Sequence, residues 1–358
     1  MGRNEVSTGS EAAESFADRT FRDASAAVVA VLAALGDKLG IFRELAAHGP
    51  ATAPDLARRL ALNDRYVREW LSAMACAGYV RYDAKARRFT MPEENAAVLV
   101  AENGPDFLGG LLEMLPPLFG AFDRIADTVH QGGGFPQSEF GPDFWEGMER
   151  FSAAWFENDL VQRWIPAIPE VERKLCAGAR MADLGCGRGR AIVKLARTYP
   201  KSRCDGYEVF GPAISHARKN AWISGVADRV RFEWRDATEK LLERYDIIAT
   251  FDSLHDFARP MALLRRIREA LAPDGVYLCL ETDAADRLEE NAGPFGSFYY
   301  GLSTLYCLSS ALAEGGDGLG AMGLSPERVR KLCSEAGFRM VRRVPVNDGI
   351  HALYEIRP

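Results

Sequence analysis

The sequence predicts an α/β protein: a doubly wound, mostly parallel sheet in the carboxyl-terminal half, preceded by a smaller and mainly helical domain. Strand-like apolar runs alternate with helical patterns from residue 179 onward, which is typical of a parallel sheet. A turn with three glycines follows the first of these runs and leads into a helix. The first hundred residues contain helical periodicity and one hairpin pattern instead. A chain of 358 residues is long enough for two such domains.

The amino-terminal domain is expected over residues 21–100, after a polar segment, residues 1–20, that we expect to be flexible. A helix predicted over residues 21–39 is rich in Ala, Val and Leu and apolar over much of its circumference, so it needs a partner surface. A second short helix begins at Ile41, and Thr52 opens a third in the motif Thr-Ala-Pro-Asp.

A fourth helix and a hairpin complete this domain. Asn63 is placed to cap the helix. Its apolar stripe has four members at the helical spacing i, i+3, i+4 and i+7: Val67, Trp70, Leu71 and Met74. Strand patterns over residues 79–82 and 88–91 flank the turn Asp83-Ala-Lys. Helix–turn–helix followed by a two-stranded wing is the pattern of a winged helix.

A winged helix also admits a DNA-binding regulator as an alternative function. Residues 55–90 carry eight Arg or Lys against four Asp or Glu, a net charge of +4. The helix that would enter the major groove offers only Arg65, Arg68 and Glu69 as readers of base edges. We therefore do not expect DNA as a partner, and a regulator with a cofactor-sensing second domain stays as an alternative.

The segment from Met181 to Arg190 carries most of the functional information: Met-Ala-Asp-Leu-Gly-Cys-Gly-Arg-Gly-Arg. A strand predicted over residues 179–184 ends in glycines at alternate positions, and a helix follows. Glycines without a Cβ let a ligand approach the backbone N–H groups closely. A nicotinamide-binding loop would place its third glycine at the position of Arg190. The spacing therefore argues against a nicotinamide cofactor.

Strands and helices alternate after this loop. A strand over residues 203–207 ends at Glu208, and in a doubly wound sheet this carboxylate would lie where ribose hydroxyls can donate to it. A helix over residues 211–224 leads to a strand over residues 230–234, and another strand covers residues 245–251.

The remaining elements end the sheet. Pro260 suits the first turn of a helix that stops before the turn Pro273-Asp-Gly, and a fifth strand follows over residues 276–280. Ser325 is placed to cap a last helix, which Gly337 ends.

A terminal hairpin completes the pattern. Strands are predicted over residues 339–346 and 350–356, joined by the turn Asn347-Asp-Gly. The spacing of these strands does not determine their order in the sheet.

Five segments carry a resemblance to a known family: Leu39-Gly-Ile-Phe, Tyr66-Val-Arg-Glu-Trp-Leu, Ala77-Gly-Tyr-Val, Asp183-Leu-Gly-Cys-Gly and Leu254-His-Asp-Phe. Together they resemble bacterial class I S-adenosylmethionine-dependent methyltransferases of small molecules, which are distantly similar to plant-type O-methyltransferases. The resemblance extends from about residue 21 to the end of the chain.

The resemblance implies an architecture for the whole chain. It implies a Rossmann-like, seven-stranded methyltransferase domain over residues 166–358, with an insertion over residues 284–322. A helical connector over residues 101–165 would contribute to the substrate pocket. The amino-terminal winged helix, residues 21–100, would be a dimerisation domain, so that the protein would be a homodimer.

The resemblance also implies S-adenosyl-L-methionine as the cofactor. The implied cofactor-binding residues are Asp183, Gly185, Cys186, Gly187, Gly189, Glu208, Val209, Asp236, Ala237, Phe251 and Asp252. Two of these have alternative roles: Asp183 could be a buried carboxylate bonded by the loop, and Asp236 could cap the segment that follows it.

The expected reaction is methyl transfer to a small hydrophobic or aromatic molecule, at oxygen, with N- or S-methylation as the alternative. An oxygen acceptor must lose a proton, and histidine, with an unperturbed pKa of about 6.5, suits that role. Of the five histidines, only His255 is expected just beyond a central strand, with Asp256 to orient it. The alternative is a structural loop histidine. Phe257 stands where the plant pattern has Trp, and the acidic residues that follow there are missing.

Aromatic residues in the connector and the insertion are expected to shape the acceptor pocket. The four residues expected to line this pocket are Trp155, Tyr299, Tyr300 and Tyr306. The alternative is that most of these residues are ordinary core, which is the commoner case at helical spacing.

Composition narrows the remaining possibilities. The seven cysteines form no C-x-x-C pair, which favours thiols in a reducing compartment over disulfides or zinc, and no metal is expected. The polar start is unlike a secretory signal, and the apolar run at residues 26–35 is half a membrane span. A net charge of −6 gives no reason to bind nucleic acid or anionic lipid. We expect a cytoplasmic protein without membrane association.

Overall fold

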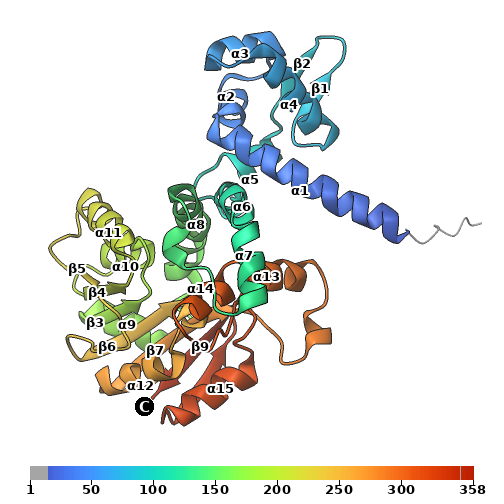
Figure 1. Cartoon of the computed structure of the whole chain (residues 1–358). Coiled ribbons are helices and arrows are strands. Elements are labelled where there is room, and N and C mark those ends of the chain that lie inside the picture. The colour runs from blue at the N-terminus through green and yellow to red at the C-terminus, as the bar shows by residue number, and fades with distance from the viewer. Residues whose placement is uncertain (1–14, 347) are drawn as a thin grey trace, which may run out of the picture. The chain divides into compact units, whose positions relative to one another are not determined.

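The computed structural model describes residues 15–346 and 348–358 of the chain (Figure 1). Its internal contacts divide the chain into two units, residues 1–96 and residues 97–358.

The first unit is a winged helix, as predicted. Its described elements are α1 (Phe16–Lys38), α2 (Ile41–His48), α3 (Ala53–Leu60), α4 (Asp64–Cys76), β1 (Arg81–Asp83), β2 (Arg88–Thr90) and the beginning of α5 (Glu93–Leu99). Strands β1 and β2 are antiparallel, with Tyr82 opposite Phe89. Helices followed by a two-stranded wing are what the sequence pattern predicted.

Helix α1 begins five residues earlier than expected. Ser15 caps it, because its hydroxyl accepts a hydrogen bond from the Asp18 N–H at 3.1 Å. Residues 16–20, expected to be flexible, are therefore helical, and residues 1–14 lie outside the described part of the chain. The Ser-x-x-Asp pattern at residues 15–18 was the signal that the expectation overlooked.

The other predicted caps of the first unit are present. Thr52 accepts from the Asp55 N–H at 3.3 Å, and the Asn63 side chain accepts from two N–H groups at the start of α4. The predicted stripe of α4 is buried throughout: Val67, Trp70, Leu71 and Met74. The Trp70 indole N–H donates to the Leu32 carbonyl at 2.7 Å, which attaches α4 to α1.

Helix α1 exposes an apolar stripe. Five large apolar residues recur on one side of it and are exposed: Phe21, Val28, Val31, Leu35 and Leu39. Soluble surfaces rarely leave a contiguous apolar stripe of this kind uncovered. Among the described residues no single helix has the length and hydropathy of a membrane span; α1 and α2 reach them only when taken together, across a bend of 66°.

The second unit begins with helices that include the predicted connector, residues 101–165. These are α6 (Gly109–Gly120), α7 (Phe122–Gln131), α8 (Pro142–Trp155), a π-helical segment (Phe156–Trp164) and α9 (Pro169–Ala177). The connector residues thus belong to the same unit as the sheet.

A seven-stranded sheet forms the centre of the second unit. Its strands are β3 (Arg180–Leu184), β4 (Arg203–Glu208), β5 (Val230–Trp234), β6 (Tyr245–Phe251), β7 (Leu271–Thr282), β8 (Met340–Val344) and β9 (His351–Arg357). Their order is β5-β4-β3-β6-β7-β9-β8. Strands β3 to β7 are parallel, and β9 is antiparallel to both neighbours.

The order of the strands places the site. The chain runs outward from β3 through β4 to β5 and then returns to β6, on the other side of β3. At such a reversal the loops after the two neighbouring strands diverge, and a crevice opens at their carboxyl ends. The glycine turn after β3 and the His255 segment after β6 both reach this edge.

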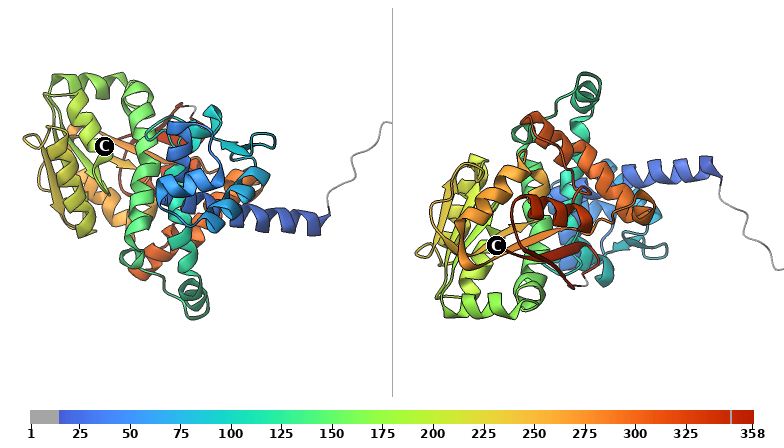
Figure 2. Two further views of the ribbon diagram at one scale, coloured as in Figure 1. Left: turned by 90° about the horizontal axis from the view of Figure 1, so that it is seen from above. Right: turned by 90° about the horizontal axis from the view of Figure 1, so that it is seen from below.

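Helices cover both faces of the sheet (Figure 2). One core contains apolar residues of α9, α10 (Arg190–Thr198) and α11 (Gly211–Ile223). The other contains apolar residues of α12 (Pro260–Ala270) and α15 (Pro326–Glu335). The caps predicted for the last helix are correct, since the Ser325 hydroxyl accepts from the Arg328 N–H. Both faces are buried, as a parallel sheet requires.

The insertion packs against the connector. It contains a short 3-10 turn (Leu288–Asn291), α13 (Pro294–Leu305) and α14 (Cys307–Ala313). A third core joins its Tyr299 and Tyr306 to Phe140 and Phe144 of the connector and to Met114 of α6. Segments more than 100 residues apart therefore form one body beside the carboxyl edge of the sheet.

The last three strands of the sheet differ from the predictions in their bounds. Strand β7 begins at Leu271, because Leu271 pairs with Tyr245 before the predicted turn Pro273-Asp-Gly bulges out and pairing resumes at Val276. Strand β8 begins one residue later and ends two residues earlier than predicted, and β9 is shifted by one residue toward the carboxyl terminus. Asn347 of the predicted turn lies outside the described residues.

Candidate active site

The glycine turn after β3 presents its backbone to open space. Gly185, Gly187 and Gly189 all have positive φ, at 74°, 52° and 77°. A Cβ on Gly189 would lie 2.6 Å from the Phe232 ring, whereas a Cβ on Gly187 would meet no described atom within 4 Å. Gly189 therefore serves the packing of the turn on the sheet, and Gly187 is where a ligand can lie against the backbone.

Glu208 at the end of β4 holds this turn in place. Its Oε2 accepts from the Gly187 N–H at 3.0 Å, and its Oε1 accepts from Val209 and Phe210 N–H groups at 2.8 and 2.9 Å. Burial raises the pKa of Glu208, an effect that these three N–H donors partly offset. Oε2 retains acceptor capacity for a ligand hydroxyl, because a carboxylate oxygen can accept two hydrogen bonds.

Asp183, on β3 beside this turn, is a buried carboxyl group without a full set of partners. It is 2% exposed, and its Oδ1 accepts no hydrogen bond from the described residues. The expected alternative, a carboxylate bonded by the loop, therefore fails for this oxygen. Burial, with the charge of Glu208, raises the pKa of Asp183 to about 8. A cation placed beside it would relieve both effects.

The raised pKa of Asp183 predicts a stability that depends on pH. The folded protein holds this proton up to about pH 8, whereas the unfolded chain releases it near pH 4. Stability should therefore fall by about 1.4 kcal/mol per pH unit as pH rises through that window. We expect Asp183→Asn to reduce the difference between pH 6 and pH 8, measured by chemical denaturation without ligand; the part due to the raised pKa of His255 should remain. An unchanged difference in this variant would contradict the prediction; Asp246→Asn, at a partly exposed position, is the control.

A pocket of about 300 Å³ opens at this edge of the sheet. Ten of the eleven expected cofactor residues line it: Asp183, Gly185, Cys186, Gly187, Glu208, Val209, Asp236, Ala237, Phe251 and Asp252. Asp256, Trp155 and Tyr306 line it as well. The structure thus brings together residues from β3, β4, β6, the connector and the insertion.

Four expected site residues do not line this pocket in the described chain: Gly189, His255, Tyr299 and Tyr300. Gly189 packs on Phe232, as described above. Tyr299 is buried but Tyr300 is 38% exposed, because consecutive residues of a helix face different directions. Tyr300 is therefore misplaced as a pocket residue.

Asp236, after β5, has two partners. Its Oδ1 accepts from the Thr238 N–H at 2.8 Å, so it does cap the following segment, the expected alternative. Its Oδ2 accepts from Arg259 at 2.7 Å. Arg259, which also lines the pocket, was not expected from the sequence.

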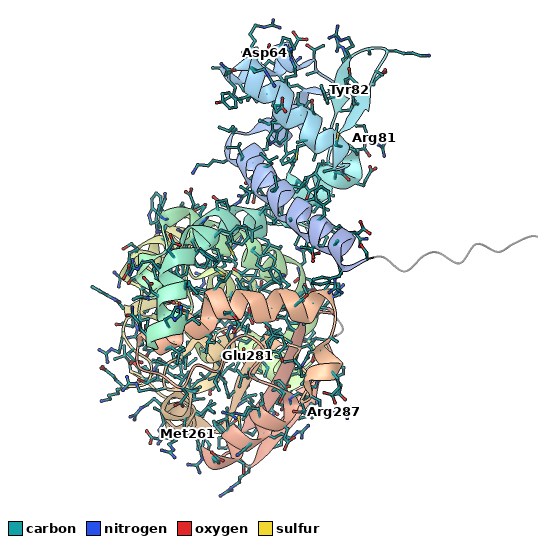
Figure 3. All side chains as sticks on the ribbon, turned by 45° about the vertical axis from the view of Figure 1, so that its right-hand side comes forward. Asp64, Arg81, Tyr82, Met261, Glu281 and Arg287 are labelled. Carbon is teal, nitrogen blue, oxygen red and sulfur yellow. The ribbon has the colours of Figure 1, made fainter. Side chains whose placement is uncertain are left out.

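His255 lies beside the pocket, buried between two carboxylates. Its Nδ1 is 2.6 Å from the Glu281 Oε2, and its Nε2 is 3.3 Å from the Asp256 Oδ1. Glu281 also accepts from the Leu254 N–H at 2.8 Å, so its position is determined by two partners. Glu281 lies on β7, inside the second unit (Figure 3).

The carboxylates decide the protonation of His255. Burial disfavours the imidazolium, but the charges of Asp256 and Glu281 outweigh it and hold the pKa of His255 well above its ordinary value. Sequence reasoning missed Glu281. A signal was available: Glu281 directly follows the apolar run of residues 276–280. An acidic residue that continues a buried strand implies a buried charge with a partner.

Cys307 adds a thiol to this cluster. It begins α14, directly after Tyr306, and it is 3% exposed. Ligand-type atoms of Cys307, His255 and Asp256 all lie within 4.8 Å of one another. Burial, with the charge of Asp256, raises the pKa of the Cys307 thiol to about 12.

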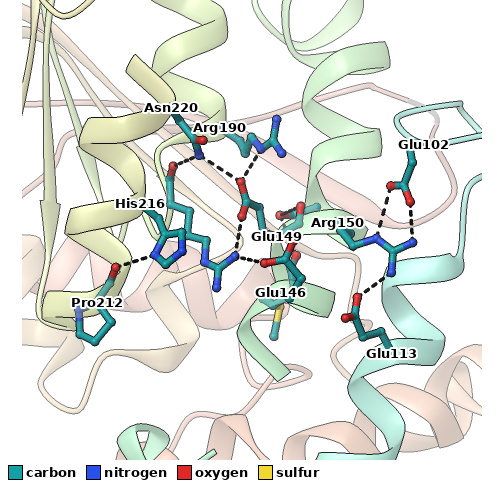
Figure 4. A network of polar contacts seen from close by, with 12 residues as sticks. Glu102, Glu113, Glu146, Glu149, Arg150, Arg190, Pro212, His216 and Asn220 are labelled. Carbon is teal, nitrogen blue, oxygen red and sulfur yellow. Dashed lines mark hydrogen bonds and ion pairs between the residues drawn. The ribbon is translucent and has the colours of Figure 1, made fainter. Parts of the chain in front are cut away.

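A second missed residue, Glu149 of α8, attaches the connector to the glycine turn (Figure 4). Its two oxygens accept from Arg188 and Arg190, each at 2.7 Å, and one of them also accepts from Asn220 at 3.0 Å. Burial would raise the pKa of Glu149, but the two guanidinium groups reverse this and lower it. The network holds α8 against the turn, which Figure 4 shows from close by.

Trp155 contacts a further buried histidine. Its ring centroid is 4.6 Å from that of His351, whose Nδ1 is 3.0 Å from the Asp348 Oδ2. Asp348 also accepts from the Trp164 indole at 3.2 Å. Despite burial, His351 and the backbone N–H groups of His351 and Ile350 hold the pKa of Asp348 well below its usual range. Trp155, which lines the pocket, thus packs against the His351 ring, which Asp348 holds in place.

Two protein-family models match the chain, one for each unit. Residues 27–101 match the Rv2258c-like winged HTH domain, and residues 175–303 match a methyltransferase domain. The second match spans the glycine turn, Glu208 and His255. The chain is an S-adenosylmethionine-dependent methyltransferase.

Relatives with both domains support this assignment. Acetylserotonin O-methyltransferase of Mus musculus is 27% identical to this methyltransferase over 342 residues, which cover 90% of this chain and 84% of the relative. The structure of mitomycin 7-O-methyltransferase MmcR is similar with a TM-score of 0.72 at 21% identity, over 95% of this chain and 97% of that one.

Two further solved structures bear on the cofactor and on the acceptor. Human N-acetylserotonin methyltransferase, solved in complex with SAM, is similar with a TM-score of 0.72 at 18% identity, over 97% and 99% of the two chains. The N,N-8-amino-8-demethyl-D-riboflavin dimethyltransferase RosA has a TM-score of 0.62 at 21% identity, over 96% and 99%. The shared fold thus occurs with different acceptor atoms.

The cofactor of this methyltransferase is S-adenosylmethionine, and the pocket suits it. The cofactor has ribose hydroxyls, an ammonium group and a sulfonium, all of which favour acceptor groups and negative charge. Glu208 offers the acceptor, Asp183 is a carboxyl with an unpartnered oxygen, and Gly187 leaves room at the turn.

Proposed function

We propose that this methyltransferase transfers a methyl group to a hydroxyl oxygen of a small hydrophobic or aromatic molecule, with His255 as the general base. The observation that carries the proposal is the placement of His255 between Glu281 and Asp256 at the carboxyl edge of β6 and β7. Two of the relatives that match both units are named O-methyltransferases, which agrees with an oxygen acceptor.

The side chains around His255 suit a base. When bound, the cofactor supplies an activated methyl group, so the chain has to hold the acceptor in line and remove its proton. The Nδ1–H of His255 donates to Glu281, so Nε2 is the ring atom that takes the hydroxyl proton. Because the pKa of His255 is raised, this base is active only after Nε2 has lost its own proton, and turnover should rise with pH. The negative charges of Glu281 and Asp256 stabilise the imidazolium that results. Both carboxylates act as positioning residues in this proposal, and Asp256 also lines the pocket.

The expected cofactor residues fit the parts of S-adenosylmethionine one by one. Glu208 would accept from the ribose hydroxyls and Asp183 would meet the ammonium group. Val209, Asp236 and Ala237, which follow β4 and β5, would line the adenine. The Glu149 network would keep the glycine turn in its binding conformation.

The aromatic residues of the pocket favour an apolar acceptor. Trp155 comes from the connector and Tyr306 from the insertion, and both line the pocket. Buried Tyr299 packs in the same third core as Tyr306. N- or S-methylation stays as the alternative, because the similar fold of RosA is that of an N,N-dimethyltransferase.

No described feature favours the DNA-binding alternative. The readers expected on α4 are engaged within their own helix: Arg68 pairs with Asp64 at 2.9 Å, and Arg65 pairs with Glu69. Such intrahelical pairs neutralise the charge that phosphates or base edges would need.

The experiment that tests the function uses matched acceptors. The protein is incubated with S-adenosylmethionine and with naphthalenes that carry a hydroxyl, an amine or a thiol at the same carbon, and the products are identified by mass spectrometry. We expect methylation of the hydroxyl probe that His255→Gln abolishes. Transfer only to the amine or the thiol would contradict the oxygen assignment.

We also propose that the winged helix is a dimerisation domain and that the exposed stripe of α1 lies in the interface. Burial of large apolar side chains is the main driving force of such interfaces. The native chain should sediment as a dimer at micromolar concentration, and the double substitution Val28→Glu with Leu35→Glu should give a folded monomer. Lys85→Glu in the β1–β2 turn is the control. A native monomer would refute this proposal.

A further inference from the structure

Three ligand-type side chains meet beside the pocket, from two segments about 50 residues apart. They are His255 and Asp256, which follow β6, and Cys307, which begins α14. Their Nε2 or Nδ1, carboxylate oxygen and Sγ atoms lie within 4.8 Å of one another. His255 and Cys307 are buried, and Asp256 is partly exposed and lines the pocket.

The spacing of two of these atoms is that of metal ligands. Nitrogen and oxygen ligands about 2.0–2.1 Å from a tetrahedral zinc ion lie about 3.3–3.4 Å apart. The His255 Nε2 and the Asp256 Oδ1 are 3.3 Å apart. The Asp256 Oδ1 is buried and makes no hydrogen bond of good geometry with the described residues, but the His255 Nε2 faces it as a charge partner; zinc would replace the proton between these two atoms.

Glu281 orients the histidine as a metal site needs. It lies 2.6 Å from the His255 Nδ1, so that the Nε2 lone pair points away from it. Metal-binding histidines usually carry a carboxylate on their other ring nitrogen in this way. Asp252, His255 and Glu281 also form a group of three, but the contact of 2.6 Å is too short for two ligands of one ion.

We propose that His255, Asp256 and Cys307 form a zinc site, with the Nε2, the Oδ1 and the Sγ as ligands and a fourth position open to the pocket. A thiolate and an imidazole select zinc over magnesium or calcium. Binding releases the thiol proton of Cys307 and the Nε2 proton of His255 to solvent, because only the thiolate and the neutral imidazole are ligands. Zinc occupies the Nε2 lone pair, so it inhibits methyl transfer; this consequence rests on the proposed role of His255, whereas the site itself does not.

Cobalt titration of the full-length protein tests the site without any acceptor. Exposed Cys76 and Cys176 are first replaced by Ser, because free surface thiols would bind the ion independently. We expect one equivalent of cobalt, a thiolate-to-cobalt charge-transfer band, and displacement by zinc. Cys307→Ser should remove the band, whereas Cys333→Ser, which changes a buried thiol elsewhere, should keep it.

A second variant tests the orientation by Glu281. Glu281→Gln should weaken zinc affinity roughly 10–100-fold, the usual effect of changing a side chain that orients a metal ligand. A native protein without the thiolate band, or a band that survives in Cys307→Ser, would overturn the proposal. Zinc that displaces cobalt, with loss of the band, but leaves methyl transfer unchanged would support the site and count against His255 as the base.

Discussion

Replacing His255 should lower the turnover number roughly 10²–10⁴-fold, the usual contribution of a positioned base, and leave the affinity for S-adenosylmethionine nearly unchanged. The reason is that His255 lies beside the pocket but outside its lining, whereas ten of the eleven residues assigned to the cofactor line it. Turnover is measured on the hydroxyl acceptor, and cofactor affinity is measured by calorimetry on the same preparation.

The choice of substitution matters for this experiment. His255→Ala leaves the buried Glu281 with only the Leu254 N–H as its partner, and removing one member of a buried ion pair costs several kcal/mol. His255→Gln is the better variant, because its amide can still donate to Glu281 but cannot take a proton. His216→Gln, on the exposed side of α11, is the matched control.

The result also bears on the acceptor atom. An ionised thiol or an unprotonated amine needs no base, so that His255→Gln would then cost little. Near-native turnover of His255→Gln on the physiological acceptor would mean that proximity alone drives the transfer, and the oxygen assignment would lose its main support.

Gly187→Val should abolish cofactor binding in calorimetry. A Cβ on Gly187 points into open space at the turn, where the cofactor has to lie against the backbone. The φ of 52° adds strain for a β-branched residue, so the turn itself would shift. Both effects lower cofactor affinity and leave the packing of the core unchanged.

A substitution at a second glycine distinguishes blocking of the cofactor site from backbone strain. Gly225, after α11, has a φ of 68° and likewise no described atom within 4 Å of an added Cβ, but it does not line the pocket. Gly225→Val should lower the melting temperature about as much as Gly187→Val and keep cofactor affinity. Cofactor affinity that survives in Gly187→Val would refute the assignment of the turn.

Local patterns predicted the elements because their causes are local. The caps at Thr52, Asn63 and Ser325 each bond a backbone N–H two or three residues away, so the residue type and its spacing suffice. The individual strands and helices were likewise recognised from the spacing of apolar residues within each segment, and their alternation along the chain predicted a parallel sheet. The same kind of signal at Ser15 was overlooked, and α1 is longer than predicted.

Short-range patterns also predicted which residues come together at the pocket. The turn from Gly185 to Gly189 and the acid at Glu208 follow consecutive strands, and parallel strands bring such positions to one edge. Tyr300 was misplaced because the run of aromatic residues in α13 does not tell which side of the helix faces the pocket.

The partners of the site depend on tertiary structure alone. Glu281 is 26 residues from His255, Cys307 is about 50 residues away, and Glu149 lies on a helix about 40 residues before the turn it holds. The sequence by itself determined the two domains, the cofactor turn and a candidate histidine. Which buried carboxylates and thiol surround that histidine was decided by the order of β6 and β7 in the sheet and by the packing of the insertion, because no local interaction specifies contacts across such separations.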